Sequence, residues 1–155
     1  MGVSGAGKTR IGRELAHALG WAFLDADDFH PASNVAKMRG GVPLETADRA
    51  VWLDALTSAL GALERGGADA VIACSALRLE FRDTLAAALD DVRFVYLKAD
   101  AALVRERVAK RDDHFMPASL VDSQFATLEE PDDALTIDAS KTPEAIVAEI
   151  ARAIA

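Results

Sequence analysis

The eight residues Gly2-Val3-Ser4-Gly5-Ala6-Gly7-Lys8-Thr9 match the pattern G-x-x-x-x-G-K-[ST]. Glycines at this spacing let backbone N–H groups turn inward around an anion, and the positive end of a following helix points at the same place. A helix does follow, because Ile11, Leu15 and Leu19 recur at helical spacing and predict one over about residues 8–19. We therefore expect a loop that cradles nucleotide phosphates, with Lys8 reaching the β- and γ-phosphates and Thr9 ligating Mg²⁺.

A loop of this kind normally follows a buried strand, but only Met1 precedes Gly2. In a parallel sheet the strand before the loop is usually central. Without it, two neighbouring strands would lose several hydrogen bonds, each contributing about 1 kcal/mol. We therefore expect Met1 to be an internal methionine of a longer natural chain.

Short apolar segments alternate with helical stretches along the rest of the sequence. Strands separated by helices of this length predict βαβ units, a parallel sheet and an α/β fold in one domain over residues 1–155. The expected strands cover residues 22–24, 70–74, 92–97 and 135–137. Besides the first helix, we expect helices over 48–65 and 78–89, one capped by Asp100, and one from about Pro143 to the end.

The composition limits the possible functions. The chain has 155 residues and a net charge of −8, and an acidic protein repels the phosphate backbone of nucleic acids. Its single cysteine, Cys74, excludes a disulfide framework and a cysteine-based zinc site, and is typical of a reducing cytosol. No apolar run approaches the length of about 20 residues that a transmembrane helix needs. We expect a cytoplasmic protein with no nucleic-acid or membrane partner.

Two carboxylates, Asp25 and Asp27, follow directly after the short apolar segment 22–24. Parallel sheets present ligand groups at such strand ends. One carboxylate can support hydrated magnesium while the other accepts a substrate hydroxyl proton. The alternative interpretation is a solvated acidic turn, since Asp28 is adjacent. Strand 70–74 ends in Cys74-Ser75 without an aspartate, and no N-K-x-D sequence is present, which argues against a GTPase.

Residues 24–53, LDADDFHPASNVAKMRGGVPLETADRAVWL, resemble the substrate-binding segment of gluconokinases, small P-loop kinases that phosphorylate D-gluconate. The resemblance continues through CSALR (74–78) and YLKAD (96–100) to about residue 131. It implies an α/β, three-layer P-loop kinase fold with sheet order 2-3-1-4-5, here without its first strand. It also implies a substrate flap over about 25–53, a lid over about 111–120, and the reaction of ATP with D-gluconate to give 6-phospho-D-gluconate. Family members are often dimeric.

The resemblance also suggests roles for individual residues. Asp27 would be the base or the orienting carboxylate for the 6-hydroxyl, Asp25 and Thr9 would hold Mg²⁺, and Lys8, Arg107 and Arg111 would neutralise phosphate charge. Taken alone, the two arginines would more often form a solvated helix face. The candidates for binding the substrate, besides Asp27, are Lys37, Arg49 and Arg78 for its carboxylate and His30, Asn34 and Gln124 for its hydroxyls.

Two other functions remain open from the sequence. One is a related kinase acting on shikimate or another sugar acid, although the block 37–52 argues against it. The other is a nucleotide-binding module without turnover, inactivated by the missing strand and by the acidic pair Asp112-Asp113 in the expected lid. Such a module would bind ATP without any substrate-dependent release of ADP.

Overall fold

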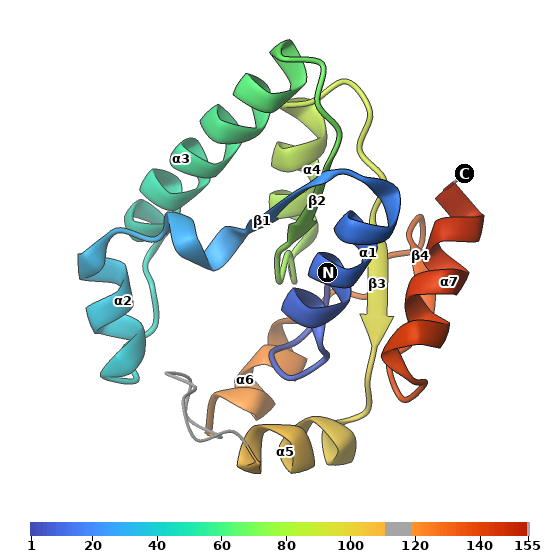
Figure 1. Cartoon of the computed structure of the whole chain (residues 1–155). Helices are drawn as coiled ribbons and strands as arrows, with labels where there is room; N and C mark the ends of the chain where they lie inside the picture. Colours follow the sequence, from blue (N-terminus) through green and yellow to red (C-terminus); the bar gives the residue numbers. More distant parts are fainter. Residues whose placement is uncertain (111–118, 155) are drawn as a thin grey trace.

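The structure, a computed structural model, describes residues 1–110 and 119–154. Helices and short strands alternate along the chain (Figure 1). The strands are β1 (Ala22–Asp25), β2 (Ala70–Ala73), β3 (Val95–Lys98) and β4 (Leu135–Asp138). The helices are α1 (Lys8–Leu19), the short 3₁₀ helix η1 (Ala26–Phe29), α2 (Ala32–Arg39), α3 (Thr46–Arg65), α4 (Leu79–Ala87), α5 (Ala101–Ala109), α6 (Ser119–Thr127) and α7 (Pro143–Ile154).

The strands form two parallel pairs. β1 pairs with β2, with Ala22 opposite Ala70, and β3 pairs with β4, with Val95 opposite Leu135. β1 and β2 correspond to strands 2 and 3 of the expected order 2-3-1-4-5, and β3 and β4 correspond to strands 4 and 5. The prediction of an α/β fold with a parallel sheet is therefore confirmed. Among the described residues no strand stands between β2 and β3, where the first strand of that order belongs.

Met1 lies between the two half-sheets, next to β3 (Figure 1). Its amino group donates to the carbonyl of Val95, and its carbonyl accepts a 3.0 Å hydrogen bond from the amide of Leu97. The amide of Gly2 donates to the carbonyl of Ser75, just past β2, at 3.1 Å. The phosphate loop thus begins at the carboxyl ends of both inner strands, the edge at which open parallel sheets bind ligands.

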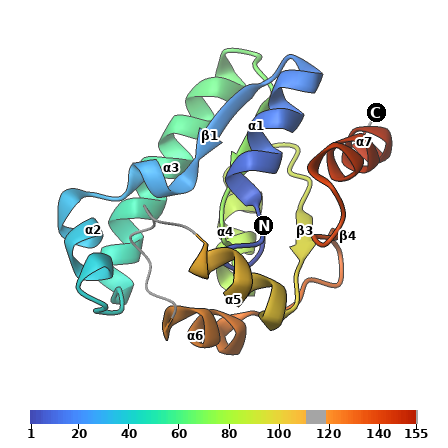
Figure 2. The ribbon, with the colours of Figure 1, turned by 60° about the horizontal axis from the view of Figure 1, so that its bottom comes forward.

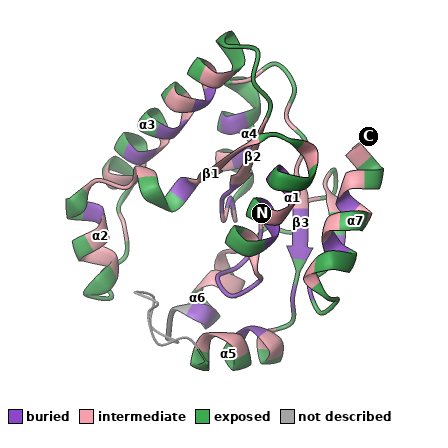
Figure 3. Ribbon diagram, viewed as in Figure 1, coloured by how far each residue is buried: buried purple, intermediate pink, exposed green. Residues whose placement is uncertain are grey.

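Two hydrophobic cores cover opposite faces of the strands, because successive strand side chains alternate between faces. Phe23 and Val71 face α1, where Gly12 makes room: a Cβ on Gly12 would lie 2.7 Å from the Phe23 ring. Leu24 and Ile72 face the opposite way, into the core under α3. The first core unites α1, β3, β4, α5 and α7, and the second unites α3 and α4 with the end of β2 (Figure 3). The strands therefore form a middle layer that is covered by helices on both faces, which makes three layers.

The helices beyond the strand ends frame the phosphate loop. α5 and α6 lie side by side below it, and the flap elements η1, α2 and the start of α3 extend to one side (Figure 2). Among the described residues, no helix is both long enough and apolar enough to cross a membrane.

Most predicted elements are confirmed, with shifted ends. The predicted strand 92–97 is wrong at both ends, because β3 is fixed by pairing with β4 and that pairing starts at Val95. The helix predicted over 78–89 is shorter, and β2 stops one residue before Cys74. Asp100 caps α5 as expected, by accepting a 2.7 Å hydrogen bond from the amide of Leu103. The sequence analysis missed η1, α2 and α6, whose segments carry no clear apolar period.

Candidate active site

The phosphate loop has the backbone that its glycines permit. Gly7 takes the N-cap position of α1 with φ of +101°, a left-handed conformation that side chains other than glycine rarely adopt. The amide groups at the start of α1 therefore face the loop, where they can receive an anion. Lys8 lies over the same loop, and its ammonium donates a 3.0 Å hydrogen bond to the carbonyl of Val3.

Arg107 reaches the phosphate loop from α5. One guanidinium nitrogen donates to the carbonyl of Ala6 at 3.3 Å, and the other donates to the carbonyl of Ala139 at 2.9 Å. Ala139 directly follows β4, so this side chain ties the loop to the last strand. The planar fork of arginine suits such a double contact, whereas the single ammonium of lysine does not.

Thr9 and Asp25 meet at the carboxyl end of β1. The Thr9 hydroxyl donates a 2.7 Å hydrogen bond to Oδ2 of Asp25, and the amide of Asp27 donates to Oδ1 at 3.2 Å. A hydroxyl and a carboxylate are hard oxygen ligands of the kind that Mg²⁺ prefers. Among the described residues no three His, Cys, Asp or Glu side chains gather into a metal site. These two residues can therefore supply part of a magnesium site, and phosphates and water would supply the remaining oxygen ligands.

Asp27 lies beside this pair, in the first turn of η1. Its side chain is exposed, but the protein around it reduces hydration of the carboxylate and raises its pKa. The negative charge of Asp25 raises the pKa further, and Lys8 acts in the opposite direction. A carboxylate with a raised pKa is a better proton acceptor than an ordinary one.

Gln124, on α6, contacts the phosphate loop. Its side-chain oxygen accepts a 2.6 Å hydrogen bond from the amide of Ser4. This contact brings α6, which follows the predicted lid, against the loop. Arg111 and most of the predicted lid, residues 111–118, lie outside the described residues.

An aromatic wall borders the flap. Trp52 is 8% exposed, and its indole N–H donates a 2.7 Å hydrogen bond to the carbonyl of Ala26. His30 stacks on Trp52 with 4.9 Å between ring centres, and Phe81 meets Trp52 edge-on with 6.5 Å between ring centres. Burial lowers the pKa of His30, which favours the neutral imidazole. A flat, partly polar wall of this kind can pack against the carbon chain of a polyol while His30 bonds a hydroxyl.

Two of the predicted substrate residues make contacts within the flap. Asn34 is 1% exposed and donates a 2.8 Å hydrogen bond to the carbonyl of Asp48, with His30 Nδ1 at 3.4 Å. Lys37 pairs with both carboxylate oxygens of Asp48, at 2.7 and 2.8 Å. Asp48 also accepts from the amide of Glu45 and caps α3. Both side chains therefore join α2 to α3.

The other two predicted cations lie near the start of α4. The Arg49 guanidinium lies 6.0 Å from the centre of the Phe81 ring, and Arg49 makes no salt bridge among the described residues. Arg78 precedes α4 and pairs with exposed Glu80 at 3.3 Å, a weak contact in water. Arg49 thus lies against the Phe81 ring, and Arg78 stands at the N-cap of the helix that carries this ring.

The structure therefore divides the predicted residues into two groups. Beside the phosphate loop lie Lys8, Thr9, Asp25, Asp27, Arg107 and Gln124. Along the flap and α4 lie His30, Asn34, Lys37, Arg49 and Arg78. The sequence analysis missed Phe81 and the pairing role of Asp48. The spacing of Phe81 three residues after Arg78, in the first turn of a predicted helix, is the signal that could have indicated it.

Comparisons with known proteins agree with this arrangement. A family model described as shikimate kinase matches residues 4–155. A thermoresistant gluconokinase of Escherichia coli K12 is 41% identical over 152 residues, which cover 96% of this chain and 87% of the relative. A crystal structure of a sugar kinase from Janibacter sp. HTCC2649 superposes with a TM-score of 0.91 at 41% identity, covering 98% of this chain and 90% of that one.

A second solved structure, a gluconokinase from Sinorhizobium meliloti 1021, superposes with a TM-score of 0.84 at 34% identity. It covers 99% of this chain and 92% of its own. The similarity therefore extends over the phosphate loop, the flap and the last helix alike. On the strength of 41% identity over nearly its whole length, this chain belongs to the gluconokinase family of small P-loop kinases.

Proposed function

We propose that this protein transfers the γ-phosphoryl group of ATP to the 6-hydroxyl of D-gluconate, giving ADP and 6-phospho-D-gluconate. The observation that supports D-gluconate as the substrate is the 41% identity to a gluconokinase across the phosphate loop and the flap. A kinase acting on shikimate is the second candidate, because the matching family model is described as shikimate kinase. The solved shikimate kinase that superposes on the chain is only 18% identical, and such a similarity supports the fold alone.

Asp27 would act as the base. It accepts the proton of the 6-hydroxyl as that oxygen forms its bond to the γ-phosphorus. The bond from the γ-phosphorus to the bridging oxygen breaks, and ADP leaves. Lys8 would turn from the Val3 carbonyl toward the β- and γ-phosphates, and Arg107 would hold the loop around them. Arg111 would add a second guanidinium from the lid.

Thr9 and Asp25 would hold the magnesium ion that accompanies ATP. The ion, when bound, neutralises phosphate charge that develops during transfer. The Asp25 carboxylate would accept from a magnesium-bound water or bind the ion itself. The Thr9 hydroxyl, which now donates to Asp25, would turn its oxygen to the metal.

For the substrate, we propose that Arg49 and Arg78 bind the carboxylate, because Lys37 is already paired with Asp48. His30 and Gln124 would bond hydroxyls, while Asn34 would keep His30 in place. Arg49→Met and Arg78→Met should each raise KM for D-gluconate about tenfold or more and leave KM for ATP unchanged. Lys37→Met is the matched control, and a larger effect there would reverse the assignment.

The substrate itself is tested with a panel. ATP turnover should be stimulated by D-gluconate and not by shikimate or by D-glucose, which lacks the carboxylate. Stimulation by shikimate alone would favour the second candidate. We further propose that the protein works in the cytoplasm as one domain, alone or as a homodimer, without nucleic-acid or membrane partners. Sedimentation of the pure protein at several concentrations tests the dimer.

A further inference from the structure

The segment between β2 and α4 contains a strained backbone position. Ala76 adopts φ of +43°, and among the described residues it is the one residue other than glycine with a positive φ. A residue that carries a side chain keeps this left-handed conformation only where the surrounding contacts hold it there. Ala76 is buried and stands two residues before Arg78, which we assign to the substrate carboxylate. The strain therefore lies beside a proposed binding residue.

Hydrogen bonds hold three successive carbonyl groups in this segment. The carbonyl of Ser75 accepts from the amide of Gly2 at 3.1 Å. Arg82, on α4, is 4% exposed, and one of its guanidinium nitrogens donates to the carbonyls of Ala76 at 3.0 Å and Leu77 at 3.3 Å. The backbone that leads to Arg78 is therefore fixed from both sides.

Glu129 holds the same backbone on either side of Arg78. It follows the end of α6 by two residues, and its amide donates a 2.8 Å hydrogen bond to the carbonyl of Leu77. Its carboxylate accepts from the amide of Leu79, the first residue of α4. The first amides of a helix have no partner within the helix, and a carboxylate also suits the positive end of the helix. Because the side chain of Arg78 makes no capping bond, Glu129 caps α4 in its place.

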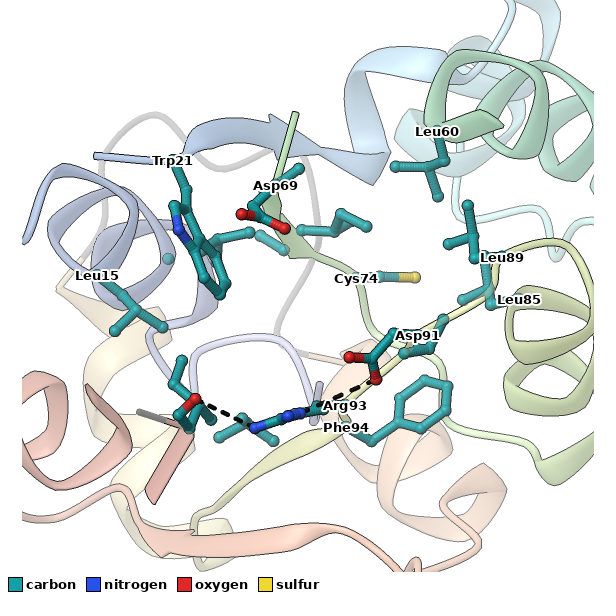
Figure 4. A pocket seen from close by; sticks show the side chains of 18 of the residues that line it. Leu15, Trp21, Leu60, Asp69, Cys74, Leu85, Leu89, Asp91, Arg93 and Phe94 are labelled. Carbon is teal, nitrogen blue, oxygen red and sulfur yellow. Dashed lines mark hydrogen bonds and ion pairs between the residues drawn. The ribbon is translucent and has the colours of Figure 1, made fainter. Parts of the chain in front are cut away.

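Apolar packing orients the far end of α4 but not its first turn. Leu85, and Leu89 just after the helix, line a cavity together with Cys74 (Figure 4). Leu79, in the first turn, is 52% exposed. The position of the first turn therefore depends on polar contacts such as the one from Glu129.

The end of α6 is itself held against the phosphate loop. Gln124, five residues before Glu129, accepts a 2.6 Å hydrogen bond from the amide of Ser4. By contrast, the side chain of Arg78 is exposed and pairs only weakly with exposed Glu80. Arg78 thus has a fixed backbone and a side chain that can turn to a ligand, which is the arrangement of a preorganised binding residue.

We propose that Glu129 is a positioning residue for the acceptor substrate. By clamping residues 77–79 from the end of α6, it fixes the point from which the Arg78 guanidinium reaches the carboxylate of D-gluconate. The inference rests on the proposed function, since it assumes that Arg78 binds this carboxylate. Glu129 itself touches neither the substrate nor the nucleotide, so its loss weakens substrate binding and leaves the phosphoryl-transfer residues in place.

The test compares Glu129→Ala and Glu129→Gln in the full chain. Glutamine keeps an oxygen that can accept from the amide of Leu79, whereas alanine does not. Glu130→Ala is the matched control, because Glu130 is the adjacent exposed carboxylate and pairs with Lys98 instead. The readouts are KM for D-gluconate, KM for ATP and kcat, and the thermal midpoint checks that each variant is folded. If the alanine variant does not fold, Glu129→Asp, whose carboxylate is one methylene shorter, replaces it with the same outcomes.

We expect Glu129→Ala to raise KM for D-gluconate about tenfold or more, while kcat and KM for ATP stay within about threefold. Glu129→Gln should recover most of the loss, and Glu130→Ala should change none of the three constants. When Arg78 is already replaced in Arg78→Met, Glu129→Ala should raise KM for D-gluconate by less than about twofold more, because both substitutions disable the same contact.

Equal KM for D-gluconate in Glu129→Ala and Glu130→Ala would overturn the inference and leave the proposed reaction intact. A full tenfold loss that persists in the Arg78→Met background would do the same, since Glu129 would then act through another group. Failure of the unsubstituted chain to phosphorylate D-gluconate would instead overturn the proposed function, and the inference with it.

Discussion

The hydroxyl of Thr9 donates a 2.7 Å hydrogen bond to Oδ2 of Asp25. This contact joins the first turn of α1 to the end of β1, two segments that the sequence separates by the whole of the first helix. It places the hydroxyl of the phosphate motif against one of the two carboxylates that follow β1. The two residues predicted to hold magnesium are therefore adjacent.

Thr9 and Asp25 should act as one unit toward magnesium. Thr9→Val and Asp25→Asn should each lower kcat/KM by about 10- to 100-fold and raise the magnesium concentration needed for half-maximal rate. The double variant should lose less than the product of the two single effects, because the residues share one ion. The measurement is a magnesium titration of the initial rate. Thr57→Val, on α3, is the control, and strictly multiplicative losses would contradict a shared site.

Asp27→Asn should abolish most turnover without preventing nucleotide binding. An amide cannot accept the hydroxyl proton, so kcat should fall by a factor of about 10² to 10⁴ while Kd for ATP stays within about twofold. Steady-state rates and calorimetric ATP binding measure the two quantities. Asp28→Asn is the matched control on the same turn, and an unchanged kcat in Asp27→Asn would remove this carboxylate from the mechanism.

The same substitution should stabilise the fold at neutral pH. The folded pKa of Asp27 is raised above its unfolded value, so the folded state holds the proton more tightly and stability falls as pH rises through the folded pKa. Asp27→Asn removes that loss. Its thermal midpoint should therefore exceed that of the unsubstituted chain at pH 7, and the difference should disappear below the unfolded pKa, near pH 3. A constant difference at all pH values would contradict the raised pKa.

Arg107 should be irreplaceable by lysine. Its guanidinium holds the carbonyls of Ala6 and Ala139 at once, and a lysine ammonium cannot keep both contacts. Arg107→Lys should weaken ATP binding by about tenfold or more, measured by calorimetry. Arg105→Lys, on the exposed side of the same helix, should leave affinity unchanged. Equal affinities for both variants would show that Arg107 does not shape the loop.

The sequence indicated which residues lie together where their placement depends on local spacing. Lys8 and Thr9 belong to a motif, and Asp25 belongs to a strand end. Each of these features fixes the local backbone geometry of its residues. The sheet order followed from the resemblance, and β1–β2 and β3–β4 occupy the expected places. The first and last helices were predictable because their apolar residues repeat regularly.

Long-range pairing was less accessible from the sequence. Nothing local indicates that Lys37 and Asp48 neutralise each other, because the flap must fold before they meet. The stacking of His30 on Trp52 depends in the same way on the approach of η1 to α3. The first residue of β3 is set by pairing with β4, whereas the apolar run in the sequence begins before that residue.

The most direct test of this account is the release of ADP by the 155-residue chain with Mg-ATP, with and without D-gluconate. We predict a rate that depends on D-gluconate, saturates with it, and falls by a factor of about 10² or more in Asp27→Asn. Calorimetric ATP binding on the same sample shows that the phosphate loop is intact. Tight ATP binding with no D-gluconate-dependent release of ADP would contradict the proposed reaction.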